Sequence, residues 1–383
     1  MANSFLRSTI ITTNSDVPAQ SVSGSALEEV ARFDGPMPTG VSVSREGRVF
    51  VNFPKWGDQA DFTVAELHQG TPVAYPNLTI NRPTSNADAE ALVSVQSIVV
   101  DPRDRLWLLD TGSPLFEPTK EGGPKEGGPK LVGVDLTTDT VFKTIIFPPD
   151  VALPTTYLND IRFDLRRGDD GMAFITDSSD QGPNAIIVVD LASGASWRRL
   201  HDHPSTKAEP GFMPFVEGQT LMVRPEQGPP QNLAMGADGI AIGADGARLY
   251  YCPLASRRLY SVDIDALCDR AMSDDKVAAT VVDEGDRGGG ADGLETDAAG
   301  NIYCTNYEHH AITRRGPNGQ FETVAHDPRL RWPDTMSVGH DGYLYVTANG
   351  FHEQARFHQG RDERHKPYYL YRLRIDAQPV LLR

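Results

Sequence analysis

The chain has 383 residues, with 36 basic and 52 acidic side chains, so its formal net charge is −16. A surface this acidic repels nucleic acid and anionic lipid, so we expect no nucleic-acid partner and no membrane partner. Hydrophobic residues make up 39% of the chain and charged residues 23%, a balance typical of a globular protein rather than a disordered one.

The N-terminal segment is mostly polar up to Gln20, without the basic and then apolar order that marks a secretory signal. The apolar runs are far shorter than the roughly 18–20 residues of a membrane-spanning helix. Three cysteines leave at least one without a disulfide partner. We therefore expect a reduced, cytoplasmic protein, although a secreted chain trimmed of its signal would have the same sequence.

The chain is built from a repeated strand pattern. Its 35 glycines and 28 prolines are spread along its whole length, which indicates many short strands separated by turns. Six segments share a small or polar residue, a short alternating strand, a turn with Asp or Gly, and a second apolar or aromatic strand. These segments are 39–51, 97–110, 160–177, 238–251, 292–304 and 334–346. Each is expected to be a β-hairpin, because its turn residues tolerate a tight reversal.

Further apolar runs follow several of these hairpins. They lie at 131–135, 185–190, 258–263 and 369–374. Two hairpins per repeat make a four-stranded antiparallel blade, and six blades arranged radially close on themselves around a central channel. We therefore predict an all-β fold, a six-bladed β-propeller that forms one domain over residues 1–383. A β-sandwich would not explain six repeats with the same turn pattern.

The longest intervals between the repeats are expected to be loops, and the N-terminal segment 1–25 is expected to be irregular. Residues 115–129 contain Glu-Gly-Gly-Pro-Lys twice, and 349–367 form a basic, aromatic loop. Residues 201–232 are too long for a hairpin loop and include a candidate short hairpin at 217–224. This segment is either a lid over the mouth of the channel or a solvated loop, and the sequence leaves both open.

A set of short motifs resembles the Yellow and major royal jelly protein family. The motifs occur in family order at 49–51, 54–56, 99–112, 158–161, 196–198, 236–241, 249–254 and 332–334, followed by Asn349. The resemblance implies a six-bladed propeller, in agreement with the repeat count. It leaves function open, because one fold hosts unrelated chemistry. Insect members of the family include nutritive proteins, pigmentation factors linked to dopachrome conversion and salivary binders of biogenic amines.

The repeats also predict a ring of side chains at one opening of the channel, where the residue before each inner strand lies. The ring consists of Thr39, Ser97, Asp160 with Asn159 beside it, Asp238, Asp292 and Asp334. Four carboxylates at one opening repel one another unless they share a cation, a proton or a cationic ligand. Oxygen ligands of this kind suit Ca²⁺ or Mg²⁺. The alternative is that each carboxylate only caps its own turn.

More distantly, the chain is similar to the gluconolactonase and regucalcin group, whose members hydrolyse lactones around a divalent cation. This similarity implies metal ligands at Asp238 and Asp292 and a substrate contact at Asn159. The first acidic ligand of that group falls on Thr39 here, which is not an anionic ligand.

The amine-binding members of the family imply a different pocket. Their ligand-contacting residues match Thr335, Asn349 and Phe351, where Phe351 could stack on a ring and Asn349 could bond a hydroxyl. The step Asn349-Gly350 is equally consistent with a simple turn.

Five histidines are candidates for proton transfer near neutral pH. His309 and His310 come shortly after a predicted strand, and His352, His358 and His365 lie in the 349–367 loop. A lone surface histidine is more often only a solvated residue. Tyr307, like Phe351, would offer an aromatic face to a cationic ligand.

We predict a small-molecule enzyme that acts at the mouth of the channel by carboxylate and histidine proton transfer, with or without a metal. Lactone hydrolysis, tautomerisation and a cyclisation or rearrangement in secondary metabolism are the reactions considered. The predicted catalytic residues are Asp292, Asp238, Asn159, Asp160 and His309, and the predicted substrate-binding residues are Thr39, Ser97, Tyr307, Asp334, Thr335, Asn349, Phe351 and His352. The alternative is a binding protein that sequesters a small aromatic or amine ligand without turnover. The sequence has no phosphate loop and no dinucleotide fingerprint, so we expect no organic cofactor.

Overall fold

The computed structural model describes residues 26–56, 58–81, 91–113 and 128–383. The expected irregular segment 1–25 and most of the expected loop 115–129 lie outside the described residues. Six four-stranded antiparallel sheets account for most of the strands. The prediction of a six-bladed β-propeller is therefore confirmed.

Each blade runs from an inner strand at the channel to an outer strand at the rim. The first blade is β2 (Val41–Val43), β3 (Val49–Asn52), β4 (Val64–His68) and β5 (Thr71–Ala74), and the second is β6 (Val95–Val100), β7 (Arg105–Asp110), β8 (Lys130–Asp135) and β9 (Thr140–Ile146). The third blade is β10 (Leu158–Asp164), β11 (Met172–Asp177), β12 (Ala185–Asp190) and β13 (Ser196–Arg199), and the fourth is β18 (Ala237–Ile242), β19 (Arg248–Pro253), β20 (Arg258–Asp263) and β21 (Val282–Asp286). The fifth blade is β22 (Leu294–Thr296), β23 (Ile302–Asn306), β24 (Ala311–Arg315) and β25 (Phe321–His326), and the sixth is β26 (Pro333–Val338), β27 (Tyr343–Ala348), β28 (Tyr368–Arg374) and β1 (Glu28–Phe33).

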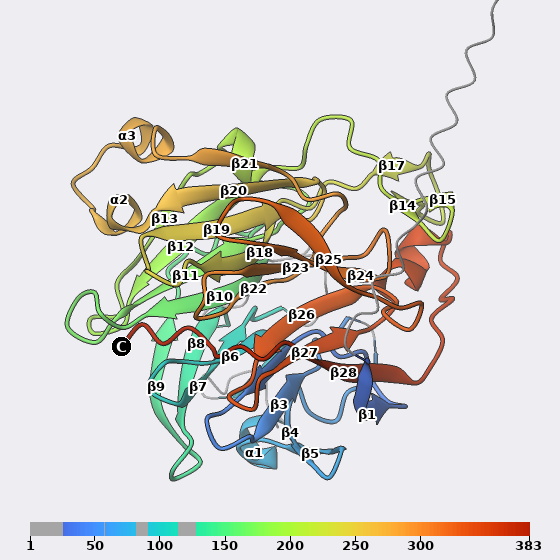
Figure 1. Ribbon diagram of the computed structural model, residues 1–383, viewed down its shortest axis with the longest axis horizontal. Coiled ribbons are helices and arrows are strands. Elements are labelled where there is room, and N and C mark those ends of the chain that lie inside the picture. Colours follow the sequence, from blue (N-terminus) through green and yellow to red (C-terminus); the bar gives the residue numbers. More distant parts are fainter. Residues whose placement is uncertain (1–25, 57, 82–90, 114–127) are drawn as a thin grey trace, which may run out of the picture.

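Figure 1 shows the labelled inner strands around the centre of the molecule and the outer strands β5, β9, β13, β21 and β1 towards its rim. All six predicted hairpins are the inner two strands of a blade, and β8, β12, β20 and β28 coincide with the predicted third strands. Helices are short and lie in the connections: α1 (Leu78–Asn81), α2 (Ile264–Cys268), α3 (Asp274–Ala278) and the 3₁₀ turns η1 (Pro204–Thr206), η2 (Phe351–Glu353) and η3 (Ala355–Phe357). In the described part of the chain, no helix is long and apolar enough to span a bilayer.

The two ends of the chain close the propeller. The N-terminal strand β1 pairs antiparallel with β28, from Glu28 opposite Arg372 to Phe33 opposite Tyr368. This pairing completes the sixth blade with a strand from the other end of the chain. The C-terminal segment crosses one face of the propeller near the channel (Figure 1), where the backbone N–H of Leu165 donates to the carbonyl of Leu382 at 2.8 Å.

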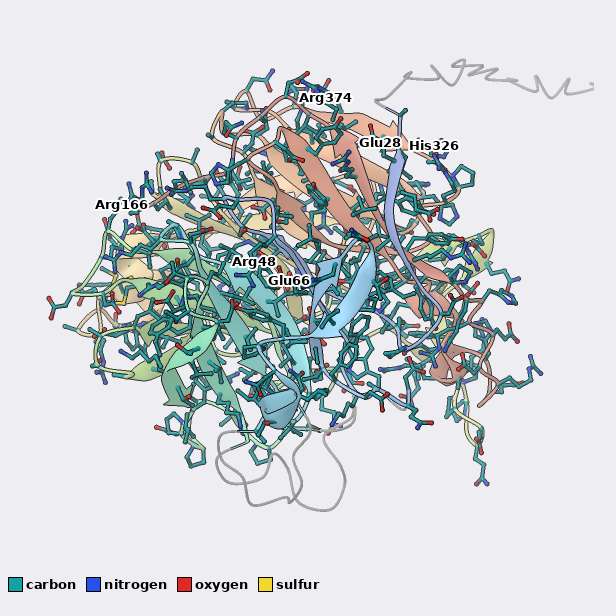
Figure 2. The ribbon with its side chains drawn as sticks, turned by 90° about the horizontal axis from the view of Figure 1, so that it is seen from below. Glu28, Arg48, Glu66, Arg166, His326 and Arg374 are labelled. Atoms are coloured by element: carbon teal, nitrogen blue, oxygen red, sulfur yellow. The ribbon has the colours of Figure 1, made fainter. Side chains whose placement is uncertain are left out.

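Arg48 connects the first blade to the second. Arg48 donates to both carboxylate oxygens of Glu66 at 2.8 Å and, also at 2.8 Å, to the carbonyl oxygen of Leu136, which follows the third strand of the second blade. Figure 2 shows the side chains of Arg48 and Glu66 next to each other. The hydrogen bond from Arg48 lowers the pKa of Glu66, so this carboxylate stays ionised at neutral pH.

The start of the inner strand is irregular in four blades, which determines where the ring side chains point. The pairing register shifts between Val95 and Ser97 in β6, between Leu158 and Ile161 in β10, between Ala237 and Ile240 in β18, and between Pro333 and Met336 in β26. Such irregularities re-aim side chains that strict alternation would send to opposite faces. The side chains of consecutive polar residues such as Asn159 and Asp160 can therefore both lie near the channel.

Glycines allow the inner strands to approach closely at the ring. A Cβ atom on Gly239 would lie 2.4 Å from the carbonyl oxygen of Asp292, and one on Gly293 would lie 2.3 Å from the carbonyl oxygen of Asp334. Both distances are too short for any other residue. The Asp-Gly steps of the repeat are therefore needed where neighbouring blades meet, in addition to any role in turns.

The 201–232 segment packs against the propeller rather than projecting into solvent. It contains two short pairs, β14 (Phe215–Val216) with β15 (Gln219–Thr220), and β16 (Met222–Val223) with β17 (Gln231–Asn232). The candidate hairpin at 217–224 is thus shifted, because Glu217 and Gly218 form the turn rather than the first strand. Phe212, Val216 and Leu221 are buried in one cluster with Phe351 and Phe357. The segment therefore covers the 349–367 loop.

Candidate active site at the mouth of the channel

A small cavity lies at the mouth of the channel, where the predicted ring was expected. Its polar lining is Gln96, Asn159, Asp238, Asp292 and Asp334, and its apolar lining is Trp56, Met235, Leu254 and Phe351. The space is about 10 Å³ for the centre of a water molecule, which is room for about one water. The structure thus brings together a carboxylate floor and an apolar, partly aromatic cover.

Asp238 is the ring carboxylate with the least compensation. It is 2% exposed, and in the described residues no N–H or O–H donor offsets its charge. Burial raises its pKa well above the usual value, and the neighbouring charges of Asp292, Asp160 and Asp334 raise it further. A carboxyl group in this position must hold a proton or share a cation.

Asp292 is the partner of Asp238 and is the ring carboxylate that keeps partial exposure. Burial raises its pKa to about 7, while hydrogen bonds from the Trp332 indole and from Asp238 limit the rise. The Trp332 Nε1–H donates to Asp292 Oδ2 at 2.6 Å. Because the two carboxyls shift each other's pKa, Asp238 and Asp292 are expected to titrate as a pair rather than as independent groups.

The other two ring carboxylates accept hydrogen bonds from neighbouring side chains. Asp334 accepts from the Thr335 hydroxyl at 3.1 Å and from the Asn349 side-chain amide at 2.6 Å. Asp160 accepts from the Ser97 hydroxyl at 3.1 Å. Burial raises the pKa of both groups, and for Asp334 the charges of Asp292 and Asp160 add to the effect.

The positive charge of Arg162, which acts on Asp160, already has other partners. Arg162 follows Asp160 by two residues in β10, and its guanidinium donates to the carbonyl oxygens of Ile161 at 2.8 Å and Leu294 at 2.6 Å. It also lies 3.6 Å from the Glu295 carboxylate. Arg162 lowers the pKa of Asp160, but burial outweighs this effect.

An amide and phenol chain fixes Asn159. The Trp56 Nε1–H donates to the Tyr157 hydroxyl at 2.7 Å, and this hydroxyl donates to Gln96 Oε1 at 2.9 Å. Gln96 Nε2 in turn donates to Asn159 Oδ1 at 3.0 Å. Asn159 is therefore oriented by a relay that begins in the cover of the cavity.

The remaining predicted site residues lie around the cavity. Thr39 is fully buried, where its hydroxyl accepts from Asn52 Nδ2 at 2.8 Å and donates to the Gln96 carbonyl at 3.2 Å. Tyr307 stacks on Trp332, with ring centroids 4.1 Å apart and an interplanar angle of 9°. His352 stacks on the same indole at 5.9 Å. Both rings thus position Trp332 and are one layer away from the carboxylates.

The structure does not bring His309 to the ring. Its side chain is exposed, whereas Asp160, Asp238 and Asp334 are at most 6% exposed. Acid–base chemistry at the mouth of the channel therefore depends on carboxyl groups rather than on this histidine.

Sequence reasoning missed Trp56, Gln96, Met235 and Leu254. Gln96 could have been found from the repeat, because it stands one residue before the ring residue Ser97. Asn159 stands in the same way one residue before Asp160. The other three are apolar residues from separate loops, and no repeat marks them.

The ring carboxyls predict an unusual pH dependence of stability. In the unfolded chain these groups ionise near their ordinary pKa, whereas in the folded protein Asp292 keeps its proton up to about pH 7. The folded state therefore binds more protons between about pH 5 and 7, and the free energy of unfolding falls as pH rises, by about 1.4 kcal/mol per pH unit for each such group. Urea unfolding at several pH values measures this slope. It should become shallower in Asp292→Asn, and an unchanged slope would contradict the assignment.

Comparison with known proteins places the chain in a family. Residues 93–379, which is 287 of its 383 residues, match the model of the major royal jelly protein family. The chain belongs to the major royal jelly protein family. The resemblance inferred from the motifs is confirmed. Relatives of this family member include the proteins yellow of Drosophila erecta and Drosophila melanogaster, each 29% identical over 238 residues, which cover 60% of the chain. The match spans 41% of the length of those relatives.

Solved structures share the fold of this royal jelly family member at low identity. A calcium-binding regucalcin from Agrobacterium tumefaciens has a TM-score of 0.55 at 15% identity, covering 94% of this chain and 98% of its own. A luciferin-regenerating enzyme has a TM-score of 0.54 at 12% identity, covering 93% and 99%. A gluconolactonase from Xanthomonas campestris has a TM-score of 0.54 at 11% identity, covering 91% and 90%. Proteins of this fold thus include lactonase-like enzymes.

Proposed function

We propose that this protein is a small-molecule enzyme whose acid–base group is the Asp238–Asp292 pair. The observation that carries the proposal is a largely buried carboxyl with a pKa of about 7 on the wall of a cavity. A general acid or base works best when its pKa lies near the working pH. Paired carboxyls whose pKa values are driven upwards by burial are typical of catalytic sites.

Hydrolysis of a small lactone or ester is the reaction that best suits this pair. Ionised Asp292 takes a proton from a water molecule as the water oxygen bonds to the substrate carbonyl carbon. The same carboxyl then returns the proton to the leaving oxygen as the ring C–O bond breaks. The cavity already has room for about one water beside this carboxyl. Tautomerisation would use the same pair to move a proton between two substrate atoms.

Asn159 and Trp332 have supporting roles in this mechanism. The Asn159 amide is fixed by Gln96 and donates to the Ser178 hydroxyl at 2.9 Å, so it is positioned to orient a substrate oxygen. The Trp332 indole holds Asp292 Oδ2, which leaves Oδ1 for proton transfer. The substrate must enter beneath Trp56, Met235, Leu254 and Phe351, so we expect this cover to open.

A divalent cation fits the donor set of the ring. The available ligands are oxygens from Asp238, Asp292, Asp334 and Asn159, which suit Ca²⁺ or Mg²⁺, and the poorly compensated Asp238 supplies the charge. A bound ion would polarise the substrate carbonyl. In the described residues no three ring carboxylates have oxygens within 4.8 Å of one another, and Thr39 adds no carboxylate. The proton-transfer role therefore does not depend on the metal.

Titration with Ca²⁺ or Mg²⁺ tests the metal part of the proposal. If the ring binds the ion, an ion concentration of 100 times Kd should stabilise the fold by about 2.7 kcal/mol, seen as a higher Tm. Asp238→Asn should remove this response, and Asp245→Asn, in the exposed turn of the same hairpin, should keep it. An equal response in all three proteins would show that the ions bind elsewhere.

A binding protein for a small amine is the second candidate. The aromatic rings of Trp56 and Phe351 lie 5.8 Å apart above the carboxylates, and an ammonium group is attracted both to ring faces and to carboxylates. A panel of lactones, quinones and aromatic amines separates the two functions. Turnover of any panel member supports the enzyme, while tight binding of an amine without conversion supports the binding protein.

A further inference from the structure

A second polar cluster lies outside the channel, where the 201–232 segment meets the sixth blade. Glu217, in the turn of the β14–β15 hairpin, extends towards three basic side chains. Its carboxylate lies 3.5 Å from His352 Nε2, 3.7 Å from His310 Nε2 and 3.5 Å from Arg331 Nε. In Figure 1, the labels of β14 and β15 lie beside the red segment that follows β27. The cluster therefore joins an insertion to a loop more than 130 residues away.

The cluster has the composition and spacing of a metal site. One ligand atom each from Glu217, His352 and Glu353 lies within 4.8 Å of the other two. In the described part of the chain, this is the group of three acidic, histidine or cysteine side chains that meets this spacing. Carboxylate oxygen together with imidazole nitrogen is a donor set that Zn²⁺ accepts.

His352 gives an independent reason to expect a ligand. Its side chain is 7% exposed, and neither ring nitrogen has a hydrogen-bond partner. A buried imidazole without a partner is costly, and here Nε2 faces the carboxylate of Glu217.

His310 is oriented as a metal ligand would be. Its Nδ1 lies 3.2 Å from the carbonyl oxygen of Leu330. Since a carbonyl oxygen only accepts, Nδ1 is the donor of this contact, and Nε2 is the ring nitrogen that faces Glu217. A backbone carbonyl that fixes the tautomer in this way is the usual second partner of a metal-bound histidine.

Arg331 sets the charge of the cluster. It is paired with Glu353, and Glu353 also accepts from the backbone N–H of His365 at 3.2 Å. The two carboxylates of Glu217 and Glu353 and the one guanidinium of Arg331 together carry one negative charge. This remaining charge favours a divalent cation, and Glu217, whose side chain is 42% exposed, gives the ion a route in.

We propose that Glu217, His352 and Glu353, with His310 beside them, bind a transition-metal cation of the zinc type. The ion would fasten the β14–β15 hairpin to the loop that carries Phe351, part of the cover of the channel cavity. His352 also stacks on Trp332, which holds Asp292. Occupancy of this site therefore orders the cover without adding a ligand to the ring.

Zinc binding by the full chain, without an affinity tag, tests this proposal. Metal analysis after gel filtration should find one Zn²⁺ per chain, and Co²⁺ in its place should give visible absorption bands. Glu217→Gln keeps the size of a half-exposed side chain and should weaken binding at least about tenfold. His352→Gln should do the same, and Glu217→Gln keeps the test valid if His352→Gln fails to fold.

Two controls separate this site from others. Glu226→Gln removes an exposed carboxylate from the same segment and should bind Zn²⁺ as the wild type does. Asp292→Asn alters the channel ring and should also retain Zn²⁺. The proposal is overturned if the wild type binds no zinc, if Glu217→Gln binds it equally well, or if Asp292→Asn alone loses it. If the wild type binds no zinc, Glu217 and His352 form only a carboxylate–imidazole contact.

Discussion

Asp292→Asn is expected to lower kcat/KM by about 10²–10⁴-fold, the usual contribution of a general acid or base. The substitution keeps the shape of the side chain and its hydrogen bond from Trp332, but it removes the group that titrates near pH 7. The loss should fall mainly on kcat, because the proton transfer occurs in the transition state. Steady-state kinetics on the substrate found in the panel measures the effect.

The control for Asp292→Asn is Asp245→Asn, which removes an equal charge in an exposed turn and should leave the kinetics unchanged. Circular dichroism and Tm show whether each variant is folded. If Asp292→Asn alters only the dissociation constant of a ligand that is never converted, the enzyme assignment is wrong and the binding protein replaces it.

Arg198→Met is expected to lower the free energy of unfolding by about 3–5 kcal/mol, as is usual when one partner of a buried ion pair is removed. The side chain of Arg198 is 6% exposed, and that of Asp177 is fully buried. The guanidinium donates to Asp177 Oδ2 at 2.8 Å and to the carbonyls of Pro183 at 2.7 Å and Val151 at 2.8 Å. Met fills similar space, but it removes the positive charge that pairs with the buried Asp177 and the hydrogen bonds that Arg198 donates to both carbonyls.

Arg198→Met should also disturb the cavity at the mouth of the channel. Asp177 accepts from the Tyr157 backbone N–H at 3.0 Å, which fixes the chain two residues before Asn159. Urea unfolding measures the stability loss, and Arg374→Met is the control, because Arg374 is 58% exposed and should change stability by no more than about 0.5 kcal/mol. A loss below about 1 kcal/mol in Arg198→Met would mean that the pair is not a structural support of the site.

The sequence contained most of the fold because each blade repeats the same local rules. Alternating apolar residues and Asp or Gly turns identified the inner hairpins, such as β18–β19 and β26–β27. The outer strand of the sixth blade was not assigned, since β1 pairs with β28 across almost the whole chain. No local pattern records which distant strand completes a blade.

The carboxylates that line the cavity could also be predicted, because they repeat from blade to blade. The residues around them could not. Asp238, Asp292 and Asp334 occupy equivalent repeat positions and do line one cavity. The pKa of each of these carboxyls depends on its burial and on hydrogen-bond donors such as Trp332. Neither can be read from the sequence. His309 was a reasonable candidate by residue type, but its exposure depends on how a loop leaves the blade.

The most direct test of the central claim is a pH titration of the aspartate carboxyl carbons by ¹³C NMR, comparing wild type with Asp292→Asn. We expect at least one aspartate that titrates near pH 7 in the folded wild type and whose signal is absent from the variant. We also expect the Asp238 signal to shift in the variant, because the charge of Asp292 raises the pKa of Asp238. If every aspartate titrates below pH 5 in the wild type, the pair carries no proton at neutral pH and the proposed acid–base site is contradicted.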